Sequence, residues 1–332
     1  MRASIFFSLS AVLVSGFTAQ SSDTTLVWPS LPERARIKHV QTVSSLQNLE
    51  GKKSFFSRVL NFFTGSEKAP PWLVQPVGIA VAPDGRMYVT DPGAKGVHVV
   101  DLKAQQYEFM AATKTGSFLS PVGVAVADDG TVYISDSQRG SVVALAADHD
   151  FKFAIADRLQ RPTGLSIAHD RLYVTDAGRH AIVLFDLKGK YVSEFGQRGA
   201  GAGEFNFPIS ITARSPDASE LFVVDALNYR VQEFDSAGRF LSTFGQQGNV
   251  AGRLASPKAI ALDADGDLYV TDALMDNLQI FDPTGKLLLI VGHSGMRDGE
   301  FSSPNGIAID RDNRIYVIET LNRRIQIFQY VR

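Results

Sequence analysis

The chain contains no cysteine, and neither sign of charge predominates in it. Without a thiol the protein forms no disulfide, so the redox compartment cannot be inferred from bridges, and no thioether-linked lipid anchor is available. Its 33 basic and 35 acidic residues leave a formal net charge of -2, which argues against the strongly basic surface of a nucleic-acid-binding protein. Beyond the N-terminus the sequence also lacks an apolar run long enough to cross a membrane.

The first residues, MRASIFFSLSAVLVSGFTAQ, are typical of a secretory signal. Arg2 supplies a positive start, and residues 5–14 supply an apolar stretch that is too short for a membrane span. The stretch LVSGF is similar to a lipoprotein signal with Phe17 in the place of the lipid-bearing cysteine. We therefore predict a signal peptide over residues 1–19 and a periplasmic or secreted protein without a lipid anchor. An N-terminal apolar strand or an irregular tail is the alternative.

A short pattern occurs six times between residues 75 and 319. Examples are QPVGIAVAPDGRMYVTD from Gln75 and SPNGIAIDRDNRIYVIE from Ser303. Each copy has a proline near its start, and consecutive prolines are 41 to 49 residues apart. The six prolines are Pro76, Pro121, Pro162, Pro208, Pro257 and Pro304. A repeat of this length indicates a solenoid, a propeller or an array.

Each repeat contains the pattern of four short strands. In the first repeat, apolar runs at residues 78–81 and 87–90 flank a Pro-Asp-Gly turn at residues 83–85, and Asp-Gly between apolar runs is a strong hairpin signal. Third and fourth apolar runs follow, as at residues 230–234 and 239–244 of the fourth repeat. Four strands per repeat make one blade of a β-propeller. We therefore predict an all-β fold with six blades.

The third strands and the loops between repeats resemble NHL repeats. The resemblance rests on RVQEFD and RIQIF in two strands and on FGQRGAGAGEFNFP and VGHSGMRDGEFSSP in two loops. It covers residues 72–332 and implies a six-bladed β-propeller of NHL type, although the fourth repeat has Ile209 and Ser210 where other repeats have a glycine. The last repeat ends soon after Phe328 without a fourth strand. We predict that residues 36–43 pair into this blade and close the ring, because an open sheet edge is a liability.

Residues 20–71 form an extension between the signal peptide and the propeller. Besides the closing strand, the extension contains SFFSRVLNFFTG, which predicts a short amphipathic helix over residues 54–64. The apolar face of this helix is rich in phenylalanine, and basic residues lie in and just before it. One interpretation is a peripheral contact with a membrane or a partner. The other is packing across one end of the propeller, since so short a helix needs support.

An acidic residue ends the second strand of every repeat. The six residues are Asp91, Asp136, Asp176, Asp225, Asp272 and Glu319. Together they would form an electronegative face or hold a cation. A structural role is the alternative, because aspartate also starts turns by accepting hydrogen bonds from nearby backbone. An arginine five residues after Asp225 and after Glu319 favours a local ion pair in those two repeats.

The sequence contains no clear metal or nucleotide site. The family resemblance implies that the residues after the six prolines face the mouth of the central channel, and these are Val77, Val122, Thr163, Ile209, Lys258 and Asn305. The set lacks the three or four ligands that calcium, magnesium or zinc needs. The run DADGD at residues 263–267 has Leu274 where a calcium loop needs a carboxylate. The glycine-rich residues 196–203 precede a strand and lack the phosphate-loop lysine. We therefore assign no metal, no cofactor and no catalytic residue.

These observations favour a non-catalytic, extracytoplasmic binding or scaffold module. Its partner would be a protein, a peptide or a glycan, held by loops on one face of a monomeric propeller. Arginine, tyrosine and methionine are typical of interface centres. On that basis the predicted binding residues are Asn228, Tyr229, Arg230, Lys258, Met275, Asn277, Asn305, Asn322, Arg323 and Arg324. The alternative is a metal-assisted lyase or hydrolase of a small cyclic or peptide-derived substrate. RNA binding is a third class, and the charge balance and the export signal argue against it.

Overall fold

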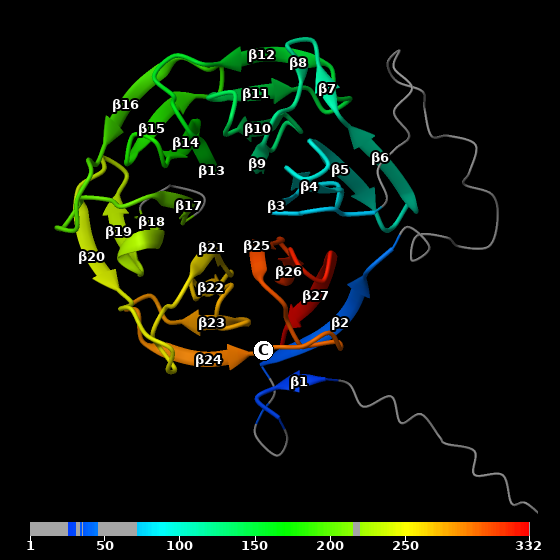
Figure 1. Ribbon diagram of the computed structural model, residues 1–332, viewed down its shortest axis with the longest axis vertical. Helices are drawn as coiled ribbons and strands as arrows, with labels where there is room; N and C mark the ends of the chain where they lie inside the picture. The colour runs from blue at the N-terminus through cyan, green and yellow to red at the C-terminus, as the bar shows by residue number, and fades with distance from the viewer. Residues whose placement is uncertain (1–25, 31–33, 35, 46–71, 215–219, 332) are drawn as a thin grey trace, which may run out of the picture.

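The computed structural model describes residues 26–30, 34, 36–45, 72–214 and 220–331. Within these ranges the chain forms six large antiparallel sheets around a central axis, as Figure 1 shows in a view down that axis. The protein is therefore an all-β, six-bladed propeller, as the repeat predicted. The predicted signal peptide and the predicted helix over residues 54–64 lie outside the described residues.

Each blade has its first strand nearest the centre of the ring and its fourth strand at the rim (Figure 1). In blades 1 to 6, numbered in chain order, the first strands are β3 (Gly78–Val81), β9 (Pro121–Val126), β13 (Pro162–Ala168), β17 (Pro208–Ala213), β21 (Pro257–Leu262) and β25 (Pro304–Ile309). The second strands are β4 (Met87–Asp91), β10 (Val132–Asp136), β14 (Arg171–Asp176), β18 (Glu220–Asp225), β22 (Leu268–Asp272) and β26 (Arg314–Glu319).

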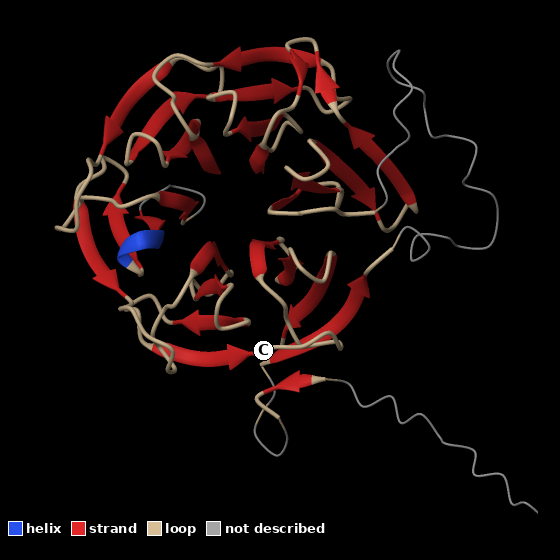
Figure 2. Cartoon of the chain, viewed as in Figure 1, coloured by secondary structure: helices blue, strands red, loops and turns tan. Residues whose placement is uncertain are grey.

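The third and fourth strands continue each sheet outwards. The third strands are β5 (Gly96–Asp101), β11 (Ser141–Leu145), β15 (Ala181–Asp186), β19 (Arg230–Asp235), β23 (Asn277–Phe281) and β27 (Arg324–Tyr330). The fourth strands of blades 1 to 5 are β6 (Gln106–Met110), β12 (Phe151–Ile155), β16 (Tyr191–Phe195), β20 (Phe240–Phe244) and β24 (Leu287–Val291). A small hairpin of β7 (Ala112–Thr113) and β8 (Gly116–Ser117) follows blade 1. The helical segment of the described chain is the 3-10 turn η2 (Ala226–Asn228), blue in Figure 2.

The sixth sheet combines the two ends of the described chain. Its strand order is β1-β2-β27-β26-β25, with β1 at Val27–Trp28 and β2 at Ile37–Val43. Strand β2 runs antiparallel to β27, so that Ile37 lies opposite Tyr330. The register shifts between His39 and Gln41 at a bulge. In Figure 1 the blue β2 lies beside the red β27 at the rim.

The core lies between neighbouring blades, and the second and third strands provide most of it. Every residue of β4, β10 and β22 is buried, because the preceding blade covers one face of each sheet and the following blade covers the other. One aromatic side chain stands at the same position of each second strand and is at most 5% exposed: Tyr88, Tyr133, Tyr173, Phe222, Tyr269 and Tyr316. Burying such a side chain stabilises the fold by about 2–3 kcal/mol. A single blade has no neighbour to cover these faces, so the ring is the unit that folds.

Hydroxyl groups and glycines join the first strands around the axis. The Thr90 hydroxyl donates to the carbonyl oxygen of Val122 in the next blade at 2.6 Å, and the Ser135 hydroxyl donates to that of Thr163 at 2.5 Å. The two backbones approach so closely that a Cβ added to Gly123 would lie 2.0 Å from the Thr163 carbonyl oxygen. Gly123, two residues after its proline, therefore occupies a place where no side chain fits.

Blade 4 makes its link to the next blade in a different way. Val224 occupies the position of the bridging hydroxyl residue, and Ser210 occupies the position of the glycine. The hydroxyl oxygen of Ser210 accepts a hydrogen bond from the backbone N–H of Ile260 in blade 5, at 3.3 Å. In blade 4 the hydroxyl group that binds the next blade therefore belongs to the first strand, whereas in blades 1 and 2 it belongs to the second strand.

Candidate functional site: one face of the ring

The six acidic residues at the ends of the second strands are fully buried. Each accepts hydrogen bonds from the loop that enters its own blade, which we call the connecting loop. Asp91 accepts from the backbone N–H groups of Val74 at 2.6 Å and Gln75 at 2.9 Å, and Asp272 accepts from Ala255 at 2.7 Å. These carboxylates therefore fix the loops and do not form an exposed electronegative face.

The pKa of Asp91 reflects this role. Burial alone would raise the pKa of this carboxyl, but the adjacent imidazole of His98 and hydrogen bonds from the N–H groups of Val74, Ala94 and Gln75 outweigh burial and hold the pKa below its usual value. His98 is itself fully buried, with its Nε2 atom 3.3 Å from an Asp91 oxygen. The carboxylate therefore remains charged at neutral pH while buried inside the ring.

In blades 4 and 6 the acidic residue also binds an arginine and an asparagine. Asp225 accepts from Arg230 Nε at 2.9 Å and from Asn228 Nδ2 at 2.7 Å. Glu319 makes the corresponding contacts with Arg324 and Asn322. Of the two interpretations offered for the acidic residues, the structure shows the local ion pair in these two blades.

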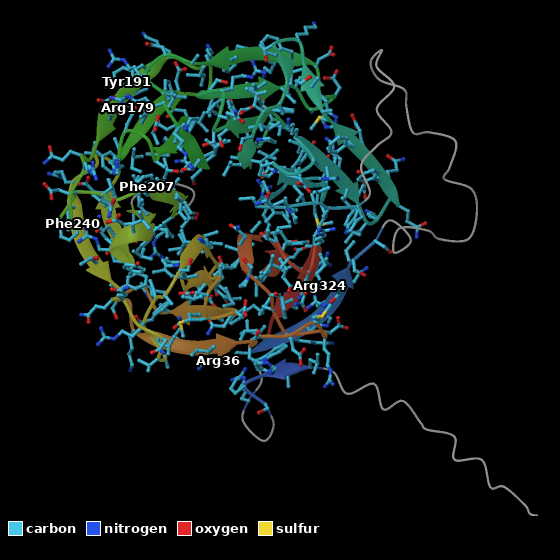
Figure 3. The ribbon with its side chains drawn as sticks, in the orientation of Figure 1. Arg36, Arg179, Tyr191, Phe207, Phe240 and Arg324 are labelled. Atoms are coloured by element: carbon cyan, nitrogen blue, oxygen red, sulfur yellow. The ribbon has the colours of Figure 1, made fainter. Side chains whose placement is uncertain are left out.

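The remaining N–H groups of both arginines bind backbone carbonyls of the connecting loops. Arg324, labelled in Figure 3, donates to the carbonyl oxygens of Met296, Arg297 and Glu300 at 2.7–2.8 Å. Arg230 donates to those of Gly201 and Glu204 in the equivalent loop, at 2.8 and 2.9 Å. These contacts occupy the guanidinium groups. The two arginines therefore hold the connecting loops in place and lie beneath the surface that the loops form.

A glutamine repeats the same support in blades 4, 5 and 6. The side-chain amides of Gln232, Gln279 and Gln326 each donate to a carbonyl oxygen of their connecting loop at 2.7–2.8 Å. Each side-chain oxygen accepts from a glycine N–H of the same loop at 2.8–3.0 Å. The three loops therefore share one geometry, which includes a parallel bridge in each between Arg198 and Phe205, Gln247 and Leu254, and Ser294 and Phe301.

Exposed apolar side chains lie on top of this supported layer. The turn between the second and third strands has a leucine two residues after the acidic residue in blades 4, 5 and 6. Leu227 is 50% exposed, Leu274 is 72% exposed and Leu321 is 70% exposed. The connecting loops add Val250 and Met296, which are 61% and 78% exposed. We call these five side chains the leucine face.

The turns and the connecting loops belong to the same end of the ring. Asn228 donates to the carbonyl oxygen of Gly199 at 2.9 Å, and Asn322 donates to that of Gly295 at 2.9 Å, so each turn contacts its loop. Blades 1 to 3 have Gly93, Gln138 and Gly178 at the leucine position. The apolar side chains therefore gather over one half of the ring.

The predicted binding residues divide into three groups in the structure. Asn228, Arg230, Asn322 and Arg324 form the support just described, and Asn277 is 6% exposed at the start of β23. Tyr229, Met275 and Arg323 lie in the turns beside the leucines, and Arg323 is exposed. Lys258 and Asn305 follow the prolines that begin β21 and β25, near the centre of the ring at the same end, and are half-buried. The structure thus brings the ten residues to one end of the ring, but mainly the turn residues reach its surface.

The leucines themselves were missed by the sequence analysis, which weighed charged and aromatic residues. The signal that would have found them is their repetition at one position of three turns, where glycine or glutamine stands in the other three. A repeated apolar residue in a turn that needs none for packing indicates an exposed contact.

The described residues offer neither a cluster of metal ligands nor a membrane-spanning helix. Among the described residues, no three His, Asp or Glu side chains are grouped so that they could share a metal ion. In the same part of the chain, no helix has the length and apolar character of a membrane span.

Comparisons with known proteins agree on the fold. A family model described as "6-bladed beta-propeller" matches residues 156–244 and 260–330. The virginiamycin B lyase structure from Staphylococcus aureus is similar with 15% identity and a TM-score of 0.55, over 78% of this chain and 96% of that chain. An auxiliary nutrient binding protein from Bacteroides thetaiotaomicron is similar with 15% identity and a TM-score of 0.62, over 78% and 70%. Hydrazine synthase from Kuenenia stuttgartiensis is similar with 18% identity and a TM-score of 0.56, over 80% of each chain. At these identities the likeness concerns the fold alone.

Proposed function

We propose that this six-bladed β-propeller is a non-catalytic binding or scaffold module of NHL type that acts outside the cytoplasm. Its partner binds on the leucine face, and the exposed apolar side chains favour a protein or peptide over a glycan. The observation that carries the proposal is the exposure of Leu227, Leu274 and Leu321, at 50%, 72% and 70%, in equivalent turns. Large apolar side chains gathered on a surface are typical of interaction sites.

The support beneath the leucine face suits a binding role. Buried carboxylates, arginines and glutamines hold the turns and connecting loops in one arrangement before any partner arrives. A preformed surface loses little conformational entropy on binding, so more of the contact energy becomes affinity. The asparagine, arginine and glutamine pattern in blades 4 and 6 also supports the NHL type, because it lies in the strands and turns that carried the sequence resemblance.

The test compares partner capture by three full-length proteins. The first is the wild type, and the second carries Leu227→Ser, Leu274→Ser and Leu321→Ser. The third is a control with Leu241→Ser and Leu288→Ser, which alters two rim leucines that are 50% and 39% exposed. We expect a partner from periplasm or culture medium to bind the wild type and the control and to be lost from the triple variant. Equal capture by the triple variant would contradict the proposal.

The N-terminal segments enter the proposal as two separate parts. Residues 1–19 direct export, and a periplasmic or secreted fraction that contains the mature protein is the expected result of cell fractionation. Residues 54–64 are a candidate second contact with a partner or a membrane surface. Deleting residues 52–65 should then weaken partner capture without lowering the melting temperature. A lowered melting temperature with unchanged capture would assign the segment to packing.

The alternative function is a metal-assisted lyase or hydrolase. It differs from the binding module in an easily measured property, since a stoichiometric divalent ion in the purified protein would favour the enzyme. RNA binding, the third class, would show strong affinity that falls steeply as the salt concentration rises.

A further inference from the structure

A groove of about 490 Å³ lies at the seam of the ring, between the outer strands of blade 6 and the turn between β5 and β6 of blade 1. Three of its lining residues are basic: Lys38, Lys103 and Arg314. Tyr316 and Ile327 line it as well and belong to the apolar core between these two blades. We call this feature the seam groove.

The register of blade 6 places two of the basic residues in one row. Lys38 on β2 and Arg314 on β26 both lie opposite Gln329 of β27. Residues that are directly opposite one another in neighbouring strands point to the same side of a sheet. Arg314 is also two residues before Tyr316, so its side chain shares the face that packs against blade 1.

The third basic residue comes from the other side of the seam. Lys103 follows Leu102 in the turn after β5, and Leu102 packs against the same apolar cluster as Tyr316. Because β26 runs from Arg314 at its start to Glu319 at the leucine face, the seam groove lies at the opposite end of the ring from that face. The two surfaces therefore share no residue.

The hydroxyl of Tyr316 makes its hydrogen bond inside blade 6 and not across the seam. In blade 2 the Tyr133 hydroxyl donates to the carbonyl oxygen of Leu187, in the matching turn of blade 3, at 2.7 Å. Tyr316 occupies the same position in blade 6, but its hydroxyl donates to Asp310 of its own blade at 2.9 Å. The Tyr316 hydroxyl therefore does not tie the Leu102 turn to blade 6, and the Tyr269 hydroxyl of blade 5 likewise donates to Asp263 of its own blade, at 2.9 Å.

The positive charges around the seam groove are not compensated within the described chain. No ion pair joins Lys38, Lys103 or Arg314 to a described carboxylate. The carboxylate of Asp310 accepts from the backbone N–H of Arg314 at 2.9 Å and from the Tyr316 hydroxyl, so its printed contacts do not include the Arg314 guanidinium. Three like charges around one concavity repel one another, and an anion placed between them would relieve that repulsion.

We propose that the seam groove binds a small organic anion. The oxyanion, a phosphate or a carboxylate, lies between Lys38, Lys103 and Arg314, and the carbon body of the ligand lies against Val40 and Leu102, the apolar lining residues that are accessible to solvent. The groove is open to solvent, and its volume of about 490 Å³ leaves room for a small molecule. A planar guanidinium beside two ammonium groups is suited to an oxyanion, because it offers paired N–H donors as well as charge. This site is independent of the leucine face and does not require the function proposed for it.

The experiment measures binding of phenyl phosphate to the full-length protein by isothermal titration calorimetry at low salt. Inorganic phosphate is titrated in parallel as a ligand with the charge but without the carbon body. The test variant carries Lys38→Gln, Lys103→Gln and Arg314→Gln. The control is Lys188→Gln, which changes the lysine of the sequence Asp-Leu-Lys in the matching turn of blade 3.

We expect saturable binding of phenyl phosphate that weakens by about tenfold or more in the triple variant and is unchanged in the control. Phenyl phosphate should bind more tightly than inorganic phosphate, and equal affinities would overturn the part of the proposal that concerns the carbon body. No saturable binding, or equal binding by the triple variant, would overturn the site itself. If the triple variant does not fold, Lys103→Gln alone, on an exposed turn, serves as the test, with an expected loss of about threefold or more.

Discussion

Replacing Arg324 with alanine should destabilise the propeller by about 3–5 kcal/mol, the usual effect of breaking a buried ion pair. The side chain of Arg324 is 7% exposed, and that of its partner Glu319 is 0% exposed. The substitution leaves the buried charge of Glu319 with Ser302, Asn322 and Gln326 as its remaining donors. Since domains are stable by about 5–15 kcal/mol in total, the loss would be a large part of the whole.

The estimate includes the ion pair but not the three carbonyl oxygens that Arg324 also binds. These belong to residues 296, 297 and 300 of the connecting loop, of which 296 and 297 are exposed, so water replaces the lost donors. The loop should therefore loosen locally without adding a second large penalty. Hydrogen exchange at the amides of residues 293–301 would report that loosening as a loss of protection.

Two other arginines provide the comparison. Arg230 has the same role in blade 4 but is 13% exposed and binds two carbonyl oxygens, so Arg230→Ala should cost less than Arg324→Ala. Arg323 is exposed beside Arg324, and Arg323→Ala should change the free energy of unfolding by less than about 0.5 kcal/mol. Urea unfolding measures all three, with the slope of the transition checked for constancy.

A double substitution separates the charge effect from the loss of packing. Arg324→Met combined with Glu319→Gln removes both charges, and it should cost less than the sum of the two single substitutions. The reasoning would be refuted if Arg324→Ala fell within about 1 kcal/mol of Arg323→Ala. It would also be refuted if the two single substitutions were simply additive in the cycle.

Three further predictions concern stability. Because hydrogen bonds hold the pKa of Asp91 below its unfolded value of about 3.9, its contribution is present above that pH and is lost as the pH falls through the folded pKa; unfolding midpoints at several pH values should show a weaker acid dependence in Asp91→Asn. Gly123→Ala should destabilise by about 1–3 kcal/mol, because the new Cβ would lie 2.0 Å from the Thr163 carbonyl oxygen, and a normal melting temperature would show that the strands can separate there. Ile37→Ala should cost about 2–4 kcal/mol, since Ile37 is fully buried in β2, and a smaller effect in urea unfolding than that of Val40→Ala, which alters an exposed neighbour, would contradict the closing role of β2.

The repeat in the sequence was enough to predict the ring of blades. The roles of individual side chains could not be predicted from it. A period of 41 to 49 residues and a turn such as Pro83-Asp84-Gly85 are local signals, and they led directly to six blades of four strands. The burial of Asp91 and Arg324 depends on where the connecting loop folds over the strand end. That position is set by contacts between residues 17 and 28 positions apart. From the sequence alone, Asp91 was a candidate for an exposed acidic face and Arg324 for a binding surface, whereas both support the surface from below.

The seam groove was even harder to predict from the sequence, because it depends on contacts between distant segments. Lys38, Lys103 and Arg314 belong to three different parts of the chain and have no shared motif. They become neighbours only because β2 enters the sixth sheet beside blade 1. A residue-by-residue search of one repeat could not have found them, since the groove is built by segments of two blades and by the N-terminal strand β2.

The pairing of β2 with β27 determines the order in which the protein can complete its fold during synthesis. Ile37 leaves the ribosome about 290 residues before Tyr330, its partner. During translation the earlier blades acquire their neighbours one after another, but β2 has nothing to bind until the final strand is made. Joining such distant segments has a high entropic cost, so the circle closes last and slowly. A chaperone or protease that acts on the nascent chain would therefore encounter an incomplete ring, in which the first and the last blades still expose apolar faces.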